Sequence, residues 1–349
     1  MNIRDSLFSS LFVLTIVFVS CQSDSNYWVG IKGETMGTYY KVTVYTNDKT
    51  LKQSIDSILV KLNKELSTYD PTSLISTFNA SKTGITVPSD SGLDLKSFDV
   101  NLSLSKQINQ RSKGNFDPSL MPIINYWGFG YKGRKTINQA DSTAIDSLMK
   151  LIGLDNVFVN IDKNSISKSI PGLELDFSAI AKGYGVDLIA DYLDEKGIEN
   201  YLVDIGGESR GKGLNRKDNK WTIGVSSPKK DAPISESILY LQLDDNAIAT
   251  SGNYRNYHET ENGKSYGHTI DATTGFPAQT DILSASVITE DCMTADAWTT
   301  TFMAMGLNKS KELVEELDGI EALFIFEANS SELETWYSSG FEQFILWQQ

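Results

Sequence analysis

The amino-acid sequence predicts an α+β fold in which mixed or antiparallel sheets pack against helices. Strand-like and helix-like segments alternate irregularly, several strands lie close enough together to form hairpins, and no long internal repeat is visible. A doubly wound parallel sheet would instead show a regular alternation of strands and helices. We therefore expect one α+β domain over residues 27–349.

Hydrophobic periodicity predicts the individual elements. Residues 38–46 alternate as a strand does, and the apolar side chains of 51–66 then recur at helical spacing. Apolar residues from Leu95 to Ile108 mark a second helix, which ends at Gly114. Further strands are expected at 157–161, 173–177, 201–205, 221–225, 238–243 and 282–289. Further helices are expected at 181–196, 294–305 and 309–317.

The N-terminal segment resembles a bacterial lipoprotein signal. Arg4 precedes a mostly apolar stretch at 7–19, which is too short to span a bilayer and has the length of a signal-peptide core. The stretch runs through Phe-Val-Ser into Cys21, which resembles a lipobox whose cysteine carries palmitate. We expect a signal peptide at 1–20, a tether at 21–26 and a lipid anchor on the periplasmic side of a bacterial membrane. The alternative is an ordinary secretory signal with an incidental cysteine.

The charge balance restricts the possible partners. The chain has a formal net charge of −14, and Arg4 and Asp5 cancel, so the mature part keeps this charge. Such a charge argues against nucleic-acid binding and against an electrostatic hold on anionic lipid. Cys292 is the second of two cysteines, so no disulfide is expected if Cys21 carries lipid. An anionic ligand must then be held by local groups or by a metal.

Several familiar catalytic patterns are incomplete. The glycine-rich stretch 206–213 nearly matches a phosphate-binding P-loop, but its last position is Gly213 instead of a hydroxyl residue, and the next residues predict a strand. Ser178 and Lys182 are four positions apart, whereas penicillin-binding enzymes space this pair by three. The chain has two histidines, which does not favour a histidine-rich zinc site. Hydrolysis by a familiar triad is therefore not supported.

The segment 175–185 has the composition of an anion site. Ser178 is predicted as the N-cap of the following helix, so the amides of 179–181 would point outward and Lys182 would add a positive charge. Gly183 and Gly185 would let a ligand or another backbone approach closely. The alternative for Lys182 is a solvated lysine on a helix surface.

Oxygen ligands occur further along the chain. Asp296 and Thr300 are four residues apart on a predicted helix, so they project from one face. Carboxylate, hydroxyl and carbonyl oxygens suit magnesium or calcium, and magnesium often completes its shell with water and substrate phosphate. The alternative for Asp296 is an acid favoured by the helix dipole. His268 and Asp271 flank the expected end of a strand, and with Lys182 these side chains predict one composite site.

Seven short segments form a series along residues 30–310. They are Gly33-Glu-Thr-Met36-Gly-Thr38, Leu66-Ser-Thr-Tyr69-Asp-Pro, Gly114-Asn-Phe116-Asp117-Pro118, Leu175-Asp176-Phe-Ser178-Ala179-Ile-Ala-Lys182-Gly183, Val203-Asp-Ile-Gly206-Gly207, His268-Thr-Ile270-Asp271 and Ala295-Asp296-Ala-Trp-Thr-Thr300. This series resembles the successive signatures of the ApbE family, the FAD:protein FMN transferases. Each segment is short, but their order makes the resemblance specific.

The resemblance implies an ApbE-type fold with FAD in a cleft and Mg²⁺ bridging its pyrophosphate. It implies flavin contacts at Met36, Tyr69, Phe116, Asp117, Pro118, Asp176, Lys182 and Ile270. It implies magnesium ligands at the Ala179 carbonyl, Asp296 and Thr300. The position three residues after Asp296 is an acid in some members and Thr299 here, which leaves a second carboxylate on the metal open.

The implied reaction is Mg²⁺-dependent transfer of FMN from FAD to a threonine or serine hydroxyl of an acceptor protein, with release of AMP. Its catalysis is positioning and charge neutralisation at phosphorus. We expect Asp296 to act through the metal and His268 to act as the base, because an ordinary histidine pKa of about 6.5 leaves the ring mostly neutral at pH 7. The alternative for His268 is a hydrogen bond that shapes the turn. The resemblance suggests acceptor subunits of sodium-pumping NADH:quinone oxidoreductase or of Rnf-type redox complexes.

Two other functions remain open at this point. Some family members hydrolyse FAD to FMN and AMP, and a flavin-binding lipoprotein without catalysis would need the same flavin contacts. Tyr69 is similar to the residue of the transferring members, which favours transfer.

Overall fold

The computed structural model describes residues 25–133, 140–228, 236–252, 257–259, 265–327 and 332–348, so the predicted signal peptide and Cys21 lie outside the described residues. The helices are α1 (Leu51–Leu66), α2 (Leu74–Ala80), α3 (Lys96–Arg111), α4 (Met121–Trp127), α5 (Ser142–Met149), α6 (Ala181–Glu195), α7 (Cys292–Met305) and α8 (Leu307–Val314), with 3₁₀ turns η1 (Leu154–Asn156) and η2 (Phe341–Phe344). The strands are β1 (Tyr27–Thr35), β2 (Thr38–Thr46), β3 (Gly84–Thr86), β4 (Val157–Asn160), β5 (Ser165–Lys168), β6 (Tyr201–Ile205), β7 (Glu208–Lys212), β8 (Trp221–Ser226), β9 (Ser237–Leu243), β10 (Ala247–Gly252), β11 (Tyr257–Glu259), β12 (Ser265–Gly267), β13 (Ile282–Thr289), β14 (Glu321–Glu327), β15 (Leu333–Tyr337) and β16 (Ile345–Gln348).

An eight-stranded sheet runs through the centre of the fold. Its strand order is β1-β2-β6-β7-β10-β13-β14-β15, and every neighbouring pair is antiparallel. The three-stranded sheets β16-β9-β8 and β3-β5-β4 and the pair β11-β12 are separate from it. The predicted α+β class with antiparallel sheets is therefore confirmed.

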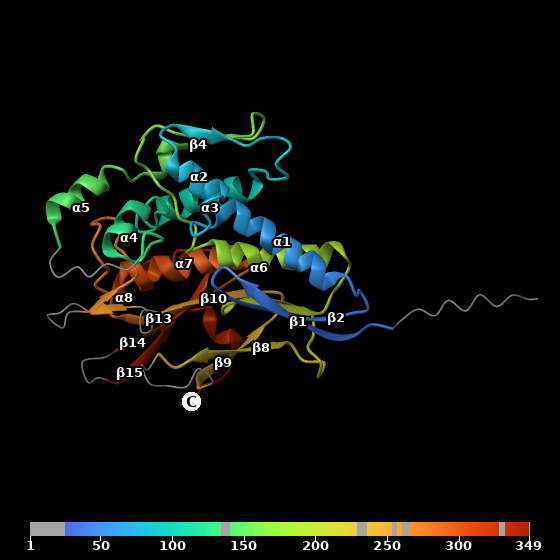
Figure 1. Cartoon of the computed structure of the whole chain (residues 1–349). Coiled ribbons are helices and arrows are strands. Elements are labelled where there is room, and N and C mark those ends of the chain that lie inside the picture. Colours follow the sequence, from blue (N-terminus) through green and yellow to red (C-terminus); the bar gives the residue numbers. More distant parts are fainter. Residues whose placement is uncertain are drawn as a thin grey trace, which may run out of the picture.

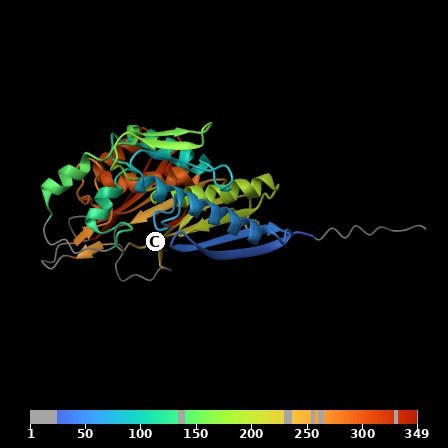
Figure 2. The same ribbon diagram turned by 45° about the horizontal axis from the view of Figure 1, so that its top comes forward.

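The helices and the sheets form layers. Helices α6 and α7 cover one face of the central sheet, and α2 and α3 lie over them on the side away from the sheet (Figures 1 and 2). Helix α1 packs against α6 and against strands β1 and β2. In this layer Trp298 of α7 stacks on Phe302 with ring centroids 5.3 Å apart, and Phe302 meets Phe324 of β14 edge-on. The sheet β16-β9-β8 covers the opposite face, where Trp221 and Leu241 pack with strands of the central sheet. Helix α7 is thus enclosed by the core along most of its length.

Most predicted elements are present with small shifts of their ends. The strands at 38–46, 201–205 and 282–289 have the predicted bounds, and the predicted helices correspond to α1, α3, α6, α7 and α8. Across the described residues we find no helix that combines the length and the hydropathy needed to span a bilayer.

The segment 173–177 is not the predicted strand. It makes one isolated bridge, and both polar side chains and backbone groups outside any sheet, such as the Pro118 carbonyl, bond the rest of its backbone. Asn79 accepts a hydrogen bond from the Leu175 amide at 2.7 Å and donates one to the Leu175 carbonyl at 2.8 Å, while the buried Lys168 ammonium donates to the Leu173 carbonyl at 2.6 Å. The apolar run therefore reflects burial and not strand pairing, and these two side chains fix the chain just before the candidate site.

The glycine-rich stretch 206–213 is a hairpin. Gly206 and Gly207 form the two-residue turn between β6 and β7 with φ of 65° and 115°, which glycine adopts without steric cost. Strand β7 begins directly afterwards at Glu208, so no helix follows the turn and a P-loop is excluded.

Candidate active site

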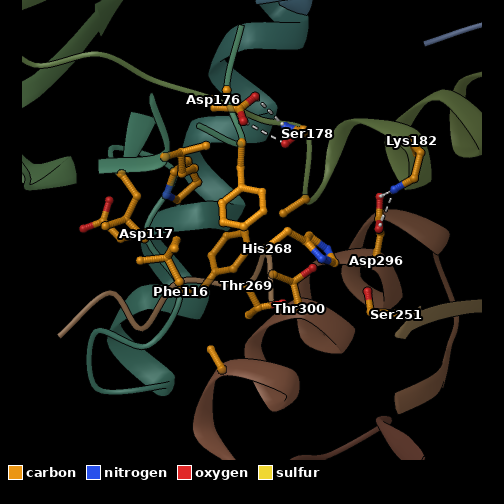
Figure 3. Close-up of a pocket in the computed structure, with 18 of the residues that line it drawn as sticks. Phe116, Asp117, Asp176, Ser178, Lys182, Ser251, His268, Thr269, Asp296 and Thr300 are labelled. Atoms are coloured by element: carbon orange, nitrogen blue, oxygen red, sulfur yellow. Dashed lines mark hydrogen bonds and ion pairs between the residues drawn. The ribbon is translucent and has the colours of Figure 1, made fainter. Parts of the chain in front are cut away.

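A cavity of about 490 Å³ brings together segments that are far apart in the sequence. Its walls come from the residues before α2, the segment after α3, the start of α6, strand β10, the segment after β12, and α7 (Figure 3). Of the residues predicted for the site, those lining it are Tyr69, Phe116, Asp117, Pro118, Asp176, Ala179, Lys182, His268, Ile270, Asp296 and Thr300. Most of the segments that the sequence-based prediction assigned to one composite site therefore line the same cavity.

Asp296 and Lys182 form an ion pair in the wall of the cavity. The Lys182 ammonium lies 3.1 and 3.4 Å from the two carboxylate oxygens of Asp296, and the Gly183 amide donates to Asp296 Oδ2 at 2.9 Å. The Asp296 side chain is almost fully buried. A buried carboxylate is stable only with such partners, so α6 supplies both a cation and a backbone donor to α7.

Gly183 lets α6 and α7 meet backbone to backbone. A Cβ atom on Gly183 would lie 2.3 Å from the Cys292 carbonyl oxygen and 2.7 Å from Met293 Cα, which confirms that this glycine permits close approach. Asp187, one turn further along α6, accepts hydrogen bonds from the amides of Cys292 and Met293 at 2.9 and 2.8 Å. Burial raises the pKa of Asp187 to about 7. These contacts fix the start of α7 on α6 and thereby place Asp296.

A second buried acid, Glu208, lies within reach of Lys182. Its Oε1 atom is 3.2 Å from the Lys182 ammonium, whereas its buried Oε2 atom has no hydrogen-bond partner among the described residues. Burial raises the pKa of Glu208 to about 7. Burial alone would lower the pKa of Lys182, but Asp296 and Glu208 raise it above its usual value, so Lys182 carries a positive charge. Glu208 was not predicted as a site residue, because the incomplete P-loop pattern around it does not indicate a role for this side chain.

Ser178 is not the N-cap that the sequence predicted. Helix α6 begins at Ala181 with Ile180 as its N-cap residue, and the amides of Ile180 and Ala181 donate to the Phe177 carbonyl at 3.0 and 2.8 Å. These amides therefore do not form an open anion site. The anion held at this helix start is the Asp296 carboxylate itself.

Three oxygen-bearing groups in the wall of the cavity suit a magnesium ion as ligands. Asp296 provides a carboxylate, and Thr300 lies one helical turn later on the cavity side of α7. The Gly183 amide would normally donate to the Ala179 carbonyl but donates to Asp296 instead, which leaves that carbonyl available. The described part of the chain contains no cluster of three or more His, Cys, Asp or Glu side chains suited to a metal. A metal here would depend on mixed oxygen ligands together with water or substrate.

Thr299 does not line the cavity. Its buried hydroxyl donates to the Asp296 backbone carbonyl at 2.7 Å and lies 2.9 Å from Ser251 Oγ. Because the single Thr299 proton is already used, Ser251 donates in the second bond. Ser251 lines the cavity from β10 and was not predicted, since a serine in a short strand carries no recognisable signal.

Aromatic and acidic side chains form the other part of the cavity. Tyr69 has 70% of its surface exposed, whereas Phe116 is buried. Asp117 and Asp176 each accept a hydrogen bond from the hydroxyl of the serine two residues later, at 2.5 and 2.8 Å. Burial raises the pKa of both carboxyl groups. This part can offer a ring surface and oriented acceptors to a ligand.

Met36 lies outside the main cavity. It lines an adjoining cavity of about 650 Å³ whose wall also includes Tyr69, Asp176 and Lys182. Met36 and Gly37 form the turn between β1 and β2, and Met36 has a φ of 50°, which residues other than glycine rarely adopt. The predicted contact at Met36 therefore belongs to a neighbouring, connected surface.

His268 directly follows β12, and its ring lies in the middle of the group drawn in Figure 3, with Asp296 to one side and Phe116 to the other. Asp271 does not line the cavity. Its carboxylate accepts hydrogen bonds from the amide and hydroxyl of Thr273 at 2.8 and 2.6 Å and so shapes the turn. Of the predicted pair, the histidine is the one that lines the cavity.

Comparison with known proteins identifies the family. The model of the ApbE family matches residues 36–324. The chain belongs to the ApbE family. The FAD:protein FMN transferases of Vibrio cholerae and Haemophilus influenzae are 36% and 32% identical to it, over 91% and 87% of this chain and 92% and 88% of theirs. The solved structure of the flavin transferase ApbE from Vibrio cholerae covers 91% of this chain and 99% of its own, with a TM-score of 0.78 and 34% identity.

A further ApbE structure has the same fold. The flavinyl transferase ApbE of Pseudomonas stutzeri, in its apo form, matches with a TM-score of 0.77 and 29% identity over 91% of this chain and 97% of that one. The ApbE-type fold implied by the sequence motifs is therefore confirmed.

Gly183→Ala tests the contact between α6 and α7. We expect the free energy of unfolding to fall by about 1–3 kcal/mol, because the new methyl group meets backbone that cannot rotate away. Urea unfolding measures this change. Gly30→Ala is the matched control, since a Cβ there meets no atom within 4 Å, and its effect should stay within about 0.5 kcal/mol. Equal stability of the two variants would contradict the contact as described.

Proposed function

We propose that this protein is a Mg²⁺-dependent FAD:protein FMN transferase. The observation that carries the proposal is one cavity in which the aromatic rings of Tyr69 and Phe116 adjoin the charged groups Lys182 and Asp296 and the imidazole of His268. The aromatic part suits a flavin ring, and the charged part suits a pyrophosphate. Membership of a family whose relatives bear this name supports the same conclusion.

The wall residues have distinct proposed roles toward FAD. Tyr69 presents an exposed ring on which the cofactor can stack, and Lys182 directs a positive charge at the pyrophosphate. The residues assigned to FAD binding are Met36, Tyr69, Phe116, Asp117, Pro118, Asp176, Lys182 and Ile270.

The proposed metal ligands are Asp296, Thr300 and the Ala179 carbonyl. When bound there, Mg²⁺ would neutralise charge on the transferred phosphoryl group. The protein contributes a nearly dry carboxylate for this purpose, since Asp296 is 1% exposed.

The proposed transfer is a single displacement at the FMN phosphorus. The hydroxyl oxygen of the acceptor threonine or serine forms a bond to that phosphorus while the bond from phosphorus to the bridging oxygen breaks. AMP leaves with the bridging oxygen, and the hydroxyl proton passes to His268. The same cavity must exclude water, because water can attack the same phosphorus.

The reaction itself is the first test. Incubation with FAD, Mg²⁺ and an acceptor domain should add the mass of FMN minus one water to the acceptor and release one AMP for each label. Intact-mass spectrometry and nucleotide chromatography measure the two products. Asp296→Asn, which removes the charge and keeps the shape, is the control and should lose the Mg²⁺-dependent rate. Free FMN and AMP without a labelled acceptor would identify a hydrolase, and no AMP would leave a flavin-binding protein without catalysis.

His268→Ala tests the proposed base. We expect the transfer rate to fall by about 10²- to 10⁴-fold while FAD affinity changes little, because a base acts in the transition state and not in the bound ground state. Added imidazole should restore part of the rate, which a purely turn-shaping histidine would not allow. Lost FAD binding with an unchanged maximal rate would contradict this role.

We also propose acceptors and a location. The acceptor is a flavoprotein subunit of a sodium-pumping NADH:quinone oxidoreductase or of an Rnf-type complex, and a lipid at Cys21 anchors the enzyme on the periplasmic side of the membrane.

Cys21→Ala should abolish incorporation of labelled fatty acid, because the thioether bond requires the thiol. Undiminished label in this variant would rule out the anchor.

A further inference from the structure

The proposed metal site raises a question about Asp296. Its carboxylate is already engaged by the Lys182 ammonium at 3.1 Å and by the Gly183 amide at 2.9 Å. A metal ion that binds this carboxylate must compete with the ammonium, and the two cations would repel each other. While no FAD phosphate is bound beside it, Lys182 therefore needs another anion close by.

Glu208 has the features of that anion. It begins β7 directly after the Gly206-Gly207 turn, and it is 5% exposed. One oxygen, Oε1, lies 3.2 Å from the Lys182 ammonium, and the other, Oε2, is buried without a hydrogen-bond partner among the described residues. Buried carboxylate oxygens normally have partners, so an unused oxygen next to a cation calls for an explanation.

We propose that the Lys182 ammonium gives up its ion pair with Asp296 and pairs with Glu208 alone when a metal ion binds Asp296. In this role Glu208 is a positioning residue that acts on the metal site through Lys182. The inference rests on the proposed magnesium site and adds to it the group that frees its carboxylate.

The Lys182 ammonium has to move only a short distance to change partners. Lys182 Nζ already touches both acids, so the ammonium needs to change only the balance of its contacts. Its long side chain is 27% exposed and can rotate, whereas Asp296 and Glu208 are held on a helix and a strand of the core. The unused Oε2 atom supplies the acceptor that the ammonium would gain in place of Asp296.

The balance of charge agrees with this assignment. In the described state two carboxylates share one ammonium, and burial raises the pKa of Glu208 to about 7. A divalent cation at Asp296 would compensate that carboxylate alone and leave the ammonium for Glu208. Without Glu208, Lys182 would have Asp296 as its sole acid within 4 Å among the described residues, and the metal would meet a stronger competitor.

A double-mutant cycle on metal binding tests the proposal. Mn²⁺ serves as the probe, because it accepts the same oxygen ligands as Mg²⁺ and its free concentration is measured by electron paramagnetic resonance. The proteins are wild type, Glu208→Gln, Lys182→Met and the double variant, with Asp296→Asn to identify the site. Urea unfolding of each variant verifies that it is folded.

We expect Glu208→Gln to weaken Mn²⁺ binding about tenfold and Lys182→Met to strengthen it. In the Lys182→Met background the Glu208→Gln change should alter affinity by no more than about twofold, because Glu208 acts on the metal site through the Lys182 ammonium, which methionine lacks. Equal weakening by Glu208→Gln in both backgrounds would show a plain charge effect and overturn the proposal. No weakening in either background would overturn it as well.

The controls separate this inference from the proposed function. If Asp296→Asn binds Mn²⁺ as wild type does, the metal site itself is wrong. If Asp296→Asn loses binding but Glu208→Gln does not, the site stands and the exchange of Lys182 is wrong.

Discussion

The ion pair between Lys182 and Asp296 is the interaction on which the rest of the site depends. It joins the start of α6 to the first turns of α7, and the Gly183 amide completes it. Two features make the pair possible. Gly183 removes the side chain that would separate the helices, and Asp187 holds the first amides of α7. The remaining wall residues are then arranged around a carboxylate whose position is set by the core.

The site explains how an acidic protein can receive an anionic ligand. The chain has a formal net charge of −14, so attraction cannot come from the protein as a whole. The cation is instead local, since Lys182 is kept charged by two buried acids. A metal at Asp296 would add further charge at the same place. The cavity therefore combines an aromatic surface, which is largely independent of charge, with a region beside it that would become positive when a metal is bound.

The sequence predicted much of the fold and most of the cavity, but for different reasons. Strands such as 201–205 and 282–289 were found because their side chains alternate or their apolar runs are bounded by turn residues. The strand expected at 173–177 was wrong because burial alone produces the same apolar run. The bond to Asn79 comes from a residue far away in the chain, and the bond from Lys168 is a side-chain contact that hydrophobic periodicity does not reveal. Cavity residues such as Tyr69 and Phe116 were found through the ordered motifs of a family, which carry information that periodicity lacks.

The residues that were missed are those whose role depends on contacts. Glu208 and Ser251 lie on strands, and the local sequence around them does not indicate a functional site. They reach the site only because the strands pair and α6 and α7 pack on them. The predicted cap at Ser178 was wrong for a related reason. The chain forms a tight turn in which the amides of Ile180 and Ala181 donate to the Phe177 carbonyl, so they cannot bind an anionic ligand. The Asp296 carboxylate, from a distant helix, accepts from the Gly183 amide at this helix start, where a ligand anion was expected.

A crystal structure with Mn²⁺ and FAD, with the metal located by anomalous scattering, tests the central claim most directly. The account predicts one metal peak bonded to Asp296, Thr300 and the Ala179 carbonyl, with FAD phosphate beside it and the Lys182 ammonium on Glu208. A metal bound elsewhere, or a Lys182 that keeps its contact with Asp296 while the metal is bound, would contradict it.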